Sequence, residues 1–416
     1  MNYSGRTNNN HMANQNFKPL LKMAVSAAVP AGVEIRQADV RKGKGLFATT
    51  SFREGDVILT ETPLVSAQFC WNELYKYKAC EFCLRSLETA EEMSQRLTEN
   101  PALTLPHPEC CAVDPSVFSL CPQCQVLYCS EACRTEAWNR YHRVLCMGPS
   151  RTDGKHPLLQ LQETWRNIHY PPETSSIMLL VKMAAMVRQS PDPKRMVDRF
   201  SKFVHTTVNE EEEIMHKLLG KEFQGQLEVL RSLAAECLYH EDIQQWLTPE
   251  GFQSVFALIG TNGQGIGSSS ISKWVKNCES LVLSSEEKEQ LDAFIDQLYI
   301  DLDQVSGAFL NCEGSGLYEL QSACNHSCVP NAEISFLHGN HTLTLSCARD
   351  IEQGEEIFIS YLDECDVDRS RHSRQKILRE NYLFICTCPK CLEQAGDIDE
   401  TSEEEMSEGE EGDMGD

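Results

Sequence analysis

Hydrophobic and polar positions follow three successive patterns along this chain. Between Val33 and Phe69, apolar and polar residues alternate in short runs separated by glycine turns, which predicts β-strands. From Leu158 to about Gln304, apolar residues recur every three or four positions, which predicts amphipathic helices with one Gly-rich break at Gly260–Ser270. Alternation returns between Gly314 and Leu362, and a last helix is predicted in DRSRHSRQKILRENY. We therefore expect an α+β protein whose β-rich domain is assembled from distant parts of the chain.

Cysteine usage narrows the picture further. The 416 residues include 20 cysteines, many of them in short CxxC and CxC pairs. The segment up to Gly32 is rich in Asn and only weakly apolar, so we interpret it as a disordered leader, with a transit peptide as the alternative. Without a convincing secretory signal, clustered cysteines indicate zinc rather than disulfides. The isolated cysteines are interpreted as small buried hydrophobes: Cys70, Cys237, Cys278, Cys312, Cys347 and Cys365.

The net charge of −25 limits the classes of partner. Phosphate binding needs a basic surface, so no direct nucleic-acid partner is expected, whereas an acidic protein attracts basic partners such as histone tails or ribosomal proteins. Eleven acidic residues and no Lys or Arg lie between Asp397 and Asp416, which we interpret as a disordered, solubilising tail. No run of 18 or more apolar residues is present, so we predict no membrane partner.

Residues 80–146 contain enough ligands for two metal sites. The ligands expected are Cys80, Cys83, Cys121, Cys124, Cys129, Cys133, His142 and Cys146. Thiolates with a neutral imidazole suit zinc, and eight ligands make two closed, four-coordinate sites of the structural type. His107, Cys110 and Cys111 lie between the CxxC pairs and are an alternative to Cys80 and Cys83. We favour the CxxC because its two-residue spacer readily chelates one ion.

A further cysteine group, CTCPKC, lies near the C-terminus. Its Cys386, Cys388 and Cys391 leave a tetrahedral zinc one ligand short. Cys328, in the segment NHSCVPN, is the supplier that we expect. Three zinc ions are therefore predicted for the whole chain.

Four of these segments together resemble a known family. KGKGLFAT, NHSCVPN, GEEIFISYLD and CxCxxC are similar to the motifs of the SET domain of protein lysine methyltransferases. The ligands from Cys121 to Cys146 resemble a MYND zinc finger, and a SET domain divided by such a finger is typical of the SET and MYND domain-containing family. The resemblance spans about Val33 to Glu393. In that family the ligand pairs interleave, which implies one site from Cys80, Cys83, Cys129 and Cys133 and another from Cys121, Cys124, His142 and Cys146.

The resemblance implies an α+β fold in which a β-rich SET domain is split by a zinc finger and a helical insertion. The expected order is a disordered leader (1–32), the first part of the SET domain (33–79), the MYND-type finger (80–146), the helical insertion (147–306), the SET catalytic core (307–363), a zinc-binding post-SET segment (364–393) and a disordered acidic tail (394–416).

Roles for individual residues also follow from the resemblance. It implies S-adenosylmethionine binding by Lys42, Gly43, Lys44, Gly45, Asn262, Asn325, His326, Tyr361 and Phe384, with Asn311 as a rival to Asn262. The glycines would let the backbone approach the cofactor closely, because they have no Cβ. Tyr361 resembles the catalytic tyrosine, while Tyr382 and Phe384 resemble the aromatics that line the lysine channel and cover the adenine. Asn331 is expected to stabilise its turn, and Cys324 has no ligand role. The basic residues of the last helix are expected to form a solvated face: Arg369, Arg371, Arg374, Lys376 and Arg379.

The function implied is an S-adenosylmethionine-dependent protein-lysine N-methyltransferase acting on histones or other basic proteins. The alternative is a zinc-stabilised interaction scaffold whose SET fold has lost catalysis; the intact set of four motifs favours the enzyme. Protein partners are expected at the finger, and a monomer is expected. No clear basic import cluster is present, so we expect a cytoplasmic protein with nuclear entry possible.

Overall fold

The computed structural model describes residues 29–39, 42–168, 176–209, 214–215, 221–307 and 314–397. Several predictions lie outside the described residues. They concern most of the leader, Asn311, Cys312 and the acidic tail from residue 398 onward.

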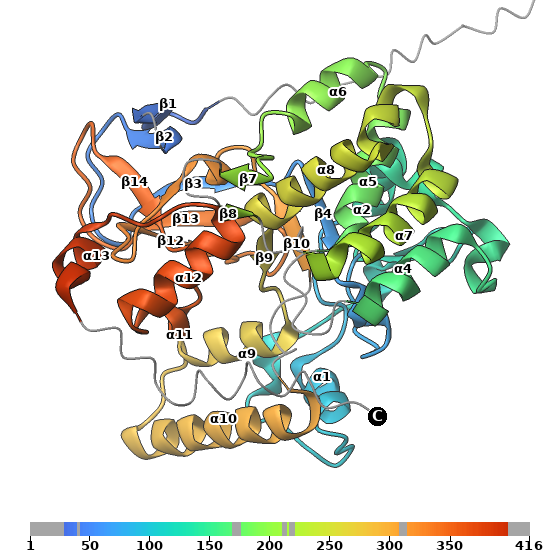
Figure 1. Cartoon of the computed structure of the whole chain (residues 1–416). Helices are drawn as coiled ribbons and strands as arrows, with labels where there is room; N and C mark the ends of the chain where they lie inside the picture. Colours follow the sequence, from blue (N-terminus) through green and yellow to red (C-terminus); the bar gives the residue numbers. More distant parts are fainter. Residues whose placement is uncertain are drawn as a thin grey trace, which may run out of the picture.

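Strands from both ends of the chain form one sheet (Figure 1). β1 (Val33–Asp39) pairs antiparallel with β2 (Gly43–Ala48), and β2 pairs with β14 (Glu356–Ile359). The short strand β11 (Asn325–His326) runs parallel to β14 and completes the order β1-β2-β14-β11. The KGKG segment is thus joined to NHSC through β14, so the predicted α+β fold and its assembly from distant segments are confirmed.

Two three-stranded sheets complete the β-rich part. They are β12 (Ala332–Ser335), β13 (Leu343–Cys347) and β3 (Val57–Glu61), and β4 (Val65–Gln68), β10 (Gly314–Leu317) and β9 (Gln264–Ile266). Apolar residues at alternate strand positions, such as Leu59, Leu345 and Ile357, meet in one core. β9 lies within the predicted Gly-rich break, so this segment contributes a sheet strand.

The cysteine-rich segment is made of short elements. They are α1 (Ala90–Leu97), the hairpin β5 (Ser119–Leu120) and β6 (Leu127–Tyr128), α2 (Glu131–Ala137), a π-helical turn (Trp138–His142) and α3 (Arg143–Leu145). Lys182 of a neighbouring helix anchors it, since its buried Nζ lies 2.8 Å from the Glu81 carboxylate and 2.9 Å from the Glu81 carbonyl. Such a pairing offsets part of the cost of burying the ammonium.

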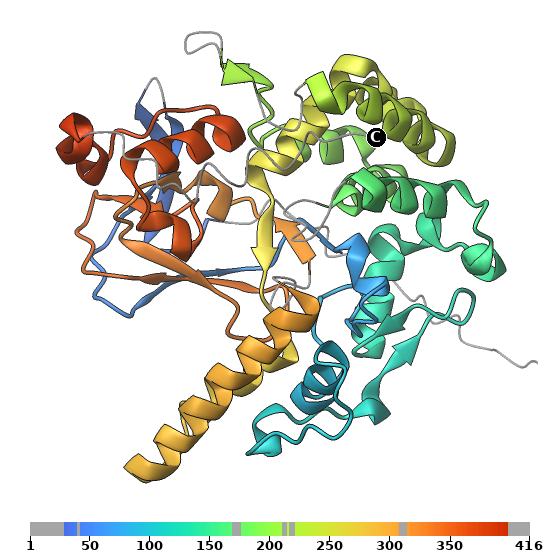
Figure 2. The ribbon, with the colours of Figure 1, turned by 60° about the horizontal axis from the view of Figure 1, so that its bottom comes forward.

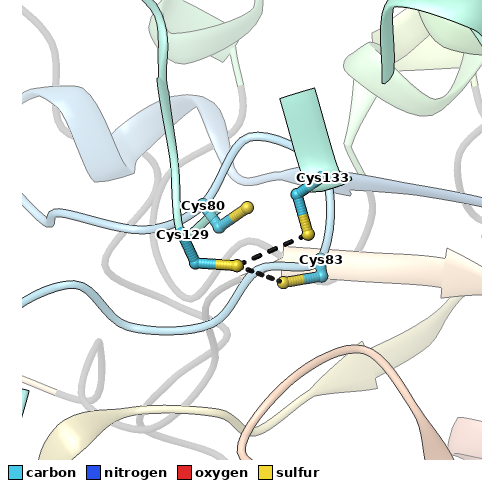
Figure 3. A group of neighbouring side chains, drawn as sticks. All are labelled: Cys80, Cys83, Cys129 and Cys133. Atoms are coloured by element: carbon cyan, nitrogen blue, oxygen red, sulfur yellow. Dashed lines mark hydrogen bonds between the residues drawn. The ribbon is translucent and has the colours of Figure 1, made fainter. Parts of the chain in front are cut away.

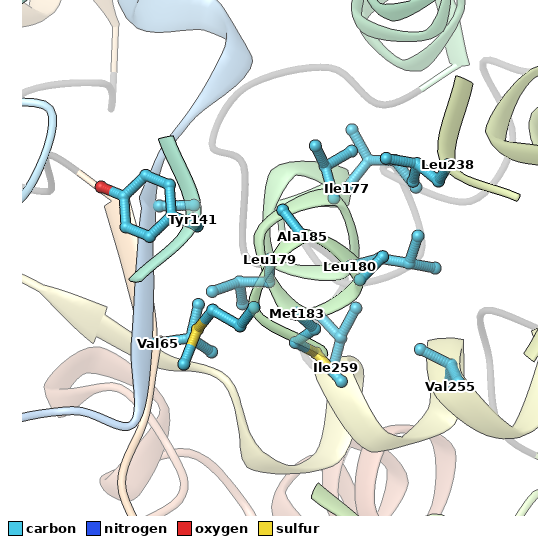
Figure 4. Close-up of a cluster of buried hydrophobic side chains, with 14 of the residues drawn as sticks. Val65, Tyr141, Ile177, Leu179, Leu180, Met183, Ala185, Leu238, Val255 and Ile259 are labelled. Carbon is cyan, nitrogen blue, oxygen red and sulfur yellow. The ribbon is translucent and has the colours of Figure 1, made fainter. Parts of the chain in front are cut away.

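Helices between residues 157 and 306 form the helical part. They are α4 (Pro157–Ile168), α5 (Ile177–Gln189), α6 (Pro193–Phe200), α7 (Lys221–Leu238), α8 (Pro249–Asn262), α9 (Ser270–Cys278) and α10 (Ser285–Ser306). α5 is buried on nearly all sides because it is central: Figure 4 shows Met183 beside Ile259 of α8, and Val65 of β4 on another side. α10 extends outward from the body beyond α9 (Figure 2). Within the described residues, no helix is both long and apolar enough to cross a membrane.

One helix prediction is wrong at its start. The run EEEEIMHKLLGKEF was expected to be helical, but Ile214–Met215 forms β8 and pairs with β7 (Val208–Asn209). The described part of the helix that follows begins at Lys221. A short apolar pair fits a strand as well as a helix, so the pattern alone does not separate the two.

The C-terminal segment packs beside β14 (Figure 1). It contains α11 (Glu364–Val367), α12 (Arg371–Tyr382) and α13 (Pro389–Glu393). The predicted solvated basic face of α12 is wrong for one residue, because the Arg374 side chain is 0% exposed. The prediction of a buried cysteine is wrong for Cys365, which is exposed because it lies on the outer side of α11.

Candidate active site and three cysteine groups

Four sulfur atoms from two segments meet in the first cysteine group (Figure 3). They belong to Cys80, Cys83, Cys129 and Cys133, and all lie within 4.8 Å of one another. Cys129 Sγ is 3.6 Å from Cys83 Sγ and 3.4 Å from Cys133 Sγ. Ser130 caps α2 through the Cys133 N–H, which places Cys129 just before the helix and Cys133 in its first turn.

The second group combines three cysteines with a histidine. Its members are Cys121, Cys124, His142 and Cys146. Cys121 Sγ is 3.8 Å from Cys146 Sγ, and Cys124 Sγ is 3.4 Å from Nε2 of His142. Burial lowers the pKa of His142, which keeps its imidazole in the neutral form that binds metals.

The alternative ligands of the HPECC segment do not join the first group. Cys110 and Cys111 lie in a 3-10 turn that packs against α9, where Asn277 Nδ2 donates to the Cys110 carbonyl at 2.7 Å. The structure therefore brings Cys80 and Cys83 to Cys129 and Cys133, in the interleaved pairing that the resemblance implied.

The third group joins the NHSC segment to the C-terminus. Its members are Cys328, Cys386, Cys388 and Cys391. Cys328 Sγ lies 3.6 Å from Cys391 Sγ, although the two residues are far apart in sequence. Gln375 of α12 fixes Cys386 with two backbone hydrogen bonds of 2.7 and 2.9 Å.

The sulfur spacings fit a metal better than disulfides. A disulfide bond is about 2.0 Å long, whereas zinc with tetrahedral bonds of about 2.3 Å separates its sulfur ligands by about 3.8 Å. Four sulfur–sulfur distances, at least one from each group, run from 3.4 to 3.8 Å, and all ligand atoms of a group lie within 4.8 Å of one another. Each group could therefore hold a metal ion, and the thiols of all three groups, with the imidazole of the second, suit zinc.

Arg374 supports this assignment at the third group. Its Nη2 lies 3.6 Å from Cys391 Sγ and 2.7 Å from the Gln394 side-chain oxygen, and Nη1 donates to the Arg369 carbonyl at 2.5 Å. Within the part of the chain that the structure describes, no carboxylate forms an ion pair with it. A fully buried cation needs a counter-charge, and Cys391 and Cys328 would supply one in the thiolate form that binds a metal.

His326 connects the third group to Tyr361. The Tyr361 backbone N–H donates to His326 Nδ1 at 3.0 Å, and His326 Nε2 lies 3.3 Å from Cys328 Sγ. A backbone N–H can only donate, so Nδ1 is the acceptor and the proton of the neutral ring sits on Nε2, facing the sulfur. Hydrogen bonds from Cys386 and then His326 lower the pKa of Cys328 to about 3, which favours the thiolate.

Tyr361 lies among aromatic rings at the end of β14. Its hydroxyl donates to the Cys324 carbonyl at 2.6 Å. Ring centroids of Tyr382, His326 and Phe384 lie 4.7, 5.4 and 6.2 Å from that of Tyr361. Burial raises the pKa of Tyr361 well above its ordinary value, so the group stays a neutral hydroxyl. These rings pack against the third cysteine group in one buried cluster.

The fold itself requires the two glycines of KGKG. Gly43 has φ +73°, a backbone conformation that favours glycine. A Cβ on Gly45 would lie 2.8 Å from Glu356 Oε1 and 2.9 Å from the Phe47 ring. The space beside the Gly45 Cα, which was expected to admit a cofactor, is therefore occupied by the side-chain carboxylate of Glu356.

Two asparagines hold the chain in place. Asn331 bonds both ways with β14, accepting from the Phe358 N–H at 2.7 Å and donating to the Glu356 carbonyl at 2.9 Å. Asn262 donates its side-chain amide N–H groups to the Val204 and Leu258 carbonyls, at 2.7 and 2.8 Å. The cofactor role implied for Asn262 stays a prediction, with only its side-chain oxygen left for it.

Sequence reasoning missed two residues of the site, Arg374 and Glu356. Glu356 accepts from Asn325 Nδ2 at 2.7 Å and lies 3.5 Å from Lys42 Nζ. Alternation along β14 could have found it: Ile357 and Ile359 are buried in the core, so Glu356 must face the other side.

Together, the β11–β14 pairing, the partly buried tyrosine and the adjoining cysteine group define a SET-domain protein. The SET domain family matches residues 43–362. The chain is 60% identical over 380 residues to protein-lysine N-trimethyltransferase SMYD5 of Danio rerio, covering 91% of this chain and 92% of the relative. It is 59% identical over 382 residues to protein-lysine N-trimethyltransferase SMYD5 of Homo sapiens, covering 92% of this chain and 91% of that relative. Histone-lysine N-methyltransferase SET5 of Mycosarcoma maydis is 25% identical over 393 residues, covering 88% of this chain and 68% of that relative. The chain therefore belongs to the SMYD5 family of SET-domain protein-lysine methyltransferases.

Proposed function

We propose that this protein-lysine N-methyltransferase uses S-adenosylmethionine to methylate lysines in basic protein segments, as far as trimethyllysine. The observation that carries the proposal is Tyr361: its hydroxyl is held by the Cys324 carbonyl, and its ring is packed against Tyr382. The degree of methylation rests on the name shared by the vertebrate relatives. The scaffold alternative is not favoured, because those relatives are enzymes.

The chain's own groups account for the chemistry that lysine requires. Bound S-adenosylmethionine supplies an activated methyl group on a sulfonium. Free lysine has a pKa near 10.4 and cannot attack while protonated, but an apolar aromatic channel disfavours the ammonium form. The Tyr361 hydroxyl and the Cys324 carbonyl lie 2.6 Å apart and can orient the amine. Because Tyr361 stays neutral, it positions the amine and does not act as a base.

We further propose that three zinc ions fill the three cysteine groups. All are closed sites of the structural type, and the third fixes the segment that carries Phe384. Metal analysis of the purified chain should give three equivalents for wild type and two for Cys391→Ser. Cys365→Ser is the matched control, because Cys365 is exposed and belongs to none of the groups. Equal zinc content in wild type and Cys391→Ser would contradict the third site.

Charge supports the class of substrate. The net charge of −25 favours basic polypeptides over nucleic acid, and histone tails and ribosomal proteins both fit. We propose a monomer with protein partners at the finger, in the cytoplasm with entry to the nucleus. Loss of methyl-lysine peptides across the proteome when the gene is removed identifies the substrate, and cell fractionation tests the compartment.

A labelling assay tests the activity. The chain is incubated with labelled S-adenosylmethionine and a pool of basic proteins, and product masses give the number of methyl groups. We expect labelling by wild type and a loss of about a hundredfold or more in Tyr361→Phe. Tyr239→Phe is the matched control, because that tyrosine is exposed on the surface. Equal labelling by Tyr361→Phe and wild type would remove Tyr361 from the mechanism.

A further inference from the structure

The side-chain amide of Asn325 has only one possible orientation. Its Nδ2 donates to the Lys44 carbonyl at 3.0 Å and to Glu356 Oε1 at 2.7 Å. A carbonyl and a carboxylate can only accept, so the atom that faces both must be the NH₂ group. Both of its hydrogens are therefore used inside the protein. Within the described residues, no donor reaches Asn325 Oδ1, so this oxygen is left able to accept a hydrogen bond from a ligand.

Glu356 is placed to enforce this orientation. Its side chain is 13% exposed, and Lys42 Nζ lies 3.5 Å from its second oxygen. The bare Cα of Gly45 makes room for it, since a Cβ there would meet Oε1 at 2.8 Å. Residues of the KGKG and NHSC segments thus meet at one carboxylate, which belongs to β14.

The neighbouring acid has different partners. Glu355 accepts from Arg349 at 2.7 Å and from Asn331 at 3.2 Å, and it makes no contact with Asn325. Glu355 lies just before β14 and Glu356 is its first residue, and their different partners show that the two glutamates of this motif serve different sites. Glu355 is therefore an internal control for Glu356.

We propose that Glu356 is a specificity-determining residue for the methyl donor, which holds Asn325 Oδ1 toward the donor's α-ammonium and supplies the negative charge behind it. The inference rests on the proposed function, because it assigns one part of the S-adenosylmethionine site. An acceptor oxygen backed by a carboxylate attracts an ammonium and repels a carboxylate. Asn325 contacts the ligand, and Glu356 acts through Asn325.

Two non-reactive ligands, compared across variants, test this contact. S-adenosylhomocysteine has the α-ammonium, whereas 5′-methylthioadenosine lacks the whole amino-acid group; neither has a sulfonium. Their dissociation constants are measured by calorimetry for wild type, Glu356→Gln, Glu356→Asp and Glu355→Gln. The quantity compared is the preference, defined as the affinity for S-adenosylhomocysteine divided by the affinity for methylthioadenosine.

Glu356→Gln should lower the preference about tenfold or more, because hydrogen bonds that involve a charged group are the stronger ones. Methylthioadenosine affinity should stay within about twofold, which also shows that the pocket is folded. Glu356→Asp keeps the charge and should retain part of the preference, and Glu355→Gln should match wild type.

Other outcomes overturn the inference in distinguishable ways. If Glu356→Gln weakens both ligands equally, the carboxylate only supports the fold of the segment. If its preference stays the same or rises, Glu356 does not serve the ammonium. If wild type binds neither ligand, the proposed function itself fails and the inference fails with it.

Discussion

His326 donates from Nε2 to the sulfur of Cys328, 3.3 Å away. The other ring nitrogen, Nδ1, accepts the backbone N–H of Tyr361 at 3.0 Å. One neutral imidazole therefore lies between a cysteine of the third group and the residue expected to orient the substrate amine. A partner of a metal ligand fixes that ligand's orientation and tunes its binding. This geometry makes His326 a positioning residue that links the third cysteine group to the proposed lysine channel.

Two variants separate the two bonds of His326. The substitution His326→Asn keeps an acceptor near the position of Nδ1 and loses the bond to Cys328, whereas His326→Gln keeps a donor near the position of Nε2 and loses the acceptor. His326→Asn should therefore release zinc to a chelator about tenfold faster or more. Its effect on kcat should be smaller than that of His326→Gln. His326→Gln should retain zinc and lower kcat. The measurements are chelator-monitored zinc release and steady-state methylation.

His338→Asn is the control, because His338 is exposed and does not belong to the third group. If the Asn and Gln variants of His326 change zinc release and kcat by the same factors, the two bonds have no separate roles.

Arg374 gives a prediction about charge at the third group. Arg374→Met removes the buried cation that faces Cys391, along with its bonds to Gln394 and the Arg369 carbonyl. Hydrogen bonds to charged groups contribute about 1.5–3 kcal/mol each, so we expect a loss of unfolding free energy of roughly that size or more. Zinc release should accelerate as well. Both are measured on the zinc-loaded chain, by denaturant unfolding and chelator kinetics.

Arg374→Lys should not restore wild-type behaviour, because lysine lacks the planar fork that reaches several acceptors at once. Arg379→Met, on the exposed side of the same helix, should change neither measurement. A stable Arg374→Met variant with normal zinc release would show that the thiolates need no counter-charge.

The cysteine groups could be predicted because metal ligands obey short spacings and fixed chemistry. CTCPKC lacked one ligand, and the structure places Cys328 beside it. The strands between 314 and 362 were predictable because their alternation matches burial in the core, as at Leu345 and Ile357. These are patterns that local sequence carries by itself.

Other features depend on contacts between distant segments. Arg374 looks like any basic residue of a surface helix, and only packing against Cys391 shows that it is buried. The space at Gly45 is occupied by Glu356, which lies in a distant part of the sequence. Ile214–Met215 pairs as a strand because Val208–Asn209 lies beside it. None of these relationships has a local signature.

Tyr382 packs against Tyr361 at the proposed lysine channel, and its ring should matter more than its hydroxyl. The ring centroid is 4.7 Å from that of Tyr361, but the hydroxyl makes only a 3.3 Å bond to the Tyr361 carbonyl. Loss of one neutral hydrogen bond costs about 1 kcal/mol, so Tyr382→Phe should keep kcat/KM within about tenfold. Tyr382→Ala opens the channel to water and should lower kcat/KM further, with KM for the protein substrate raised. If the Phe variant were as impaired as the Ala variant, the hydroxyl would be the active part.

The buried carboxyl of Glu61 should make the stability of the fold depend on pH. It is 5% exposed and accepts the backbone N–H groups of Leu320 and Gln321 at 2.9 and 3.0 Å. Burial raises the pKa of Glu61 from 4.5 to about 7, against the opposing effect of these hydrogen bonds. In the folded chain the carboxyl therefore keeps its proton up to near neutral pH, whereas in the unfolded chain it releases its proton near pH 4.5.

The folded chain thus binds one more proton than the unfolded chain between pH 4.5 and 7, so unfolding free energy must fall as pH rises through that window. Over roughly pH 5 to 8 the fall from this group is about 2 to 3 kcal/mol, at about 1.4 kcal/mol per unit of pKa. Glu61→Gln has no such titration. The difference in unfolding free energy between wild type and Glu61→Gln, measured in urea at equal zinc content, should decline across this range and level off above about pH 7. A difference that is constant with pH would mean that the two backbone hydrogen bonds hold Glu61 ionised throughout.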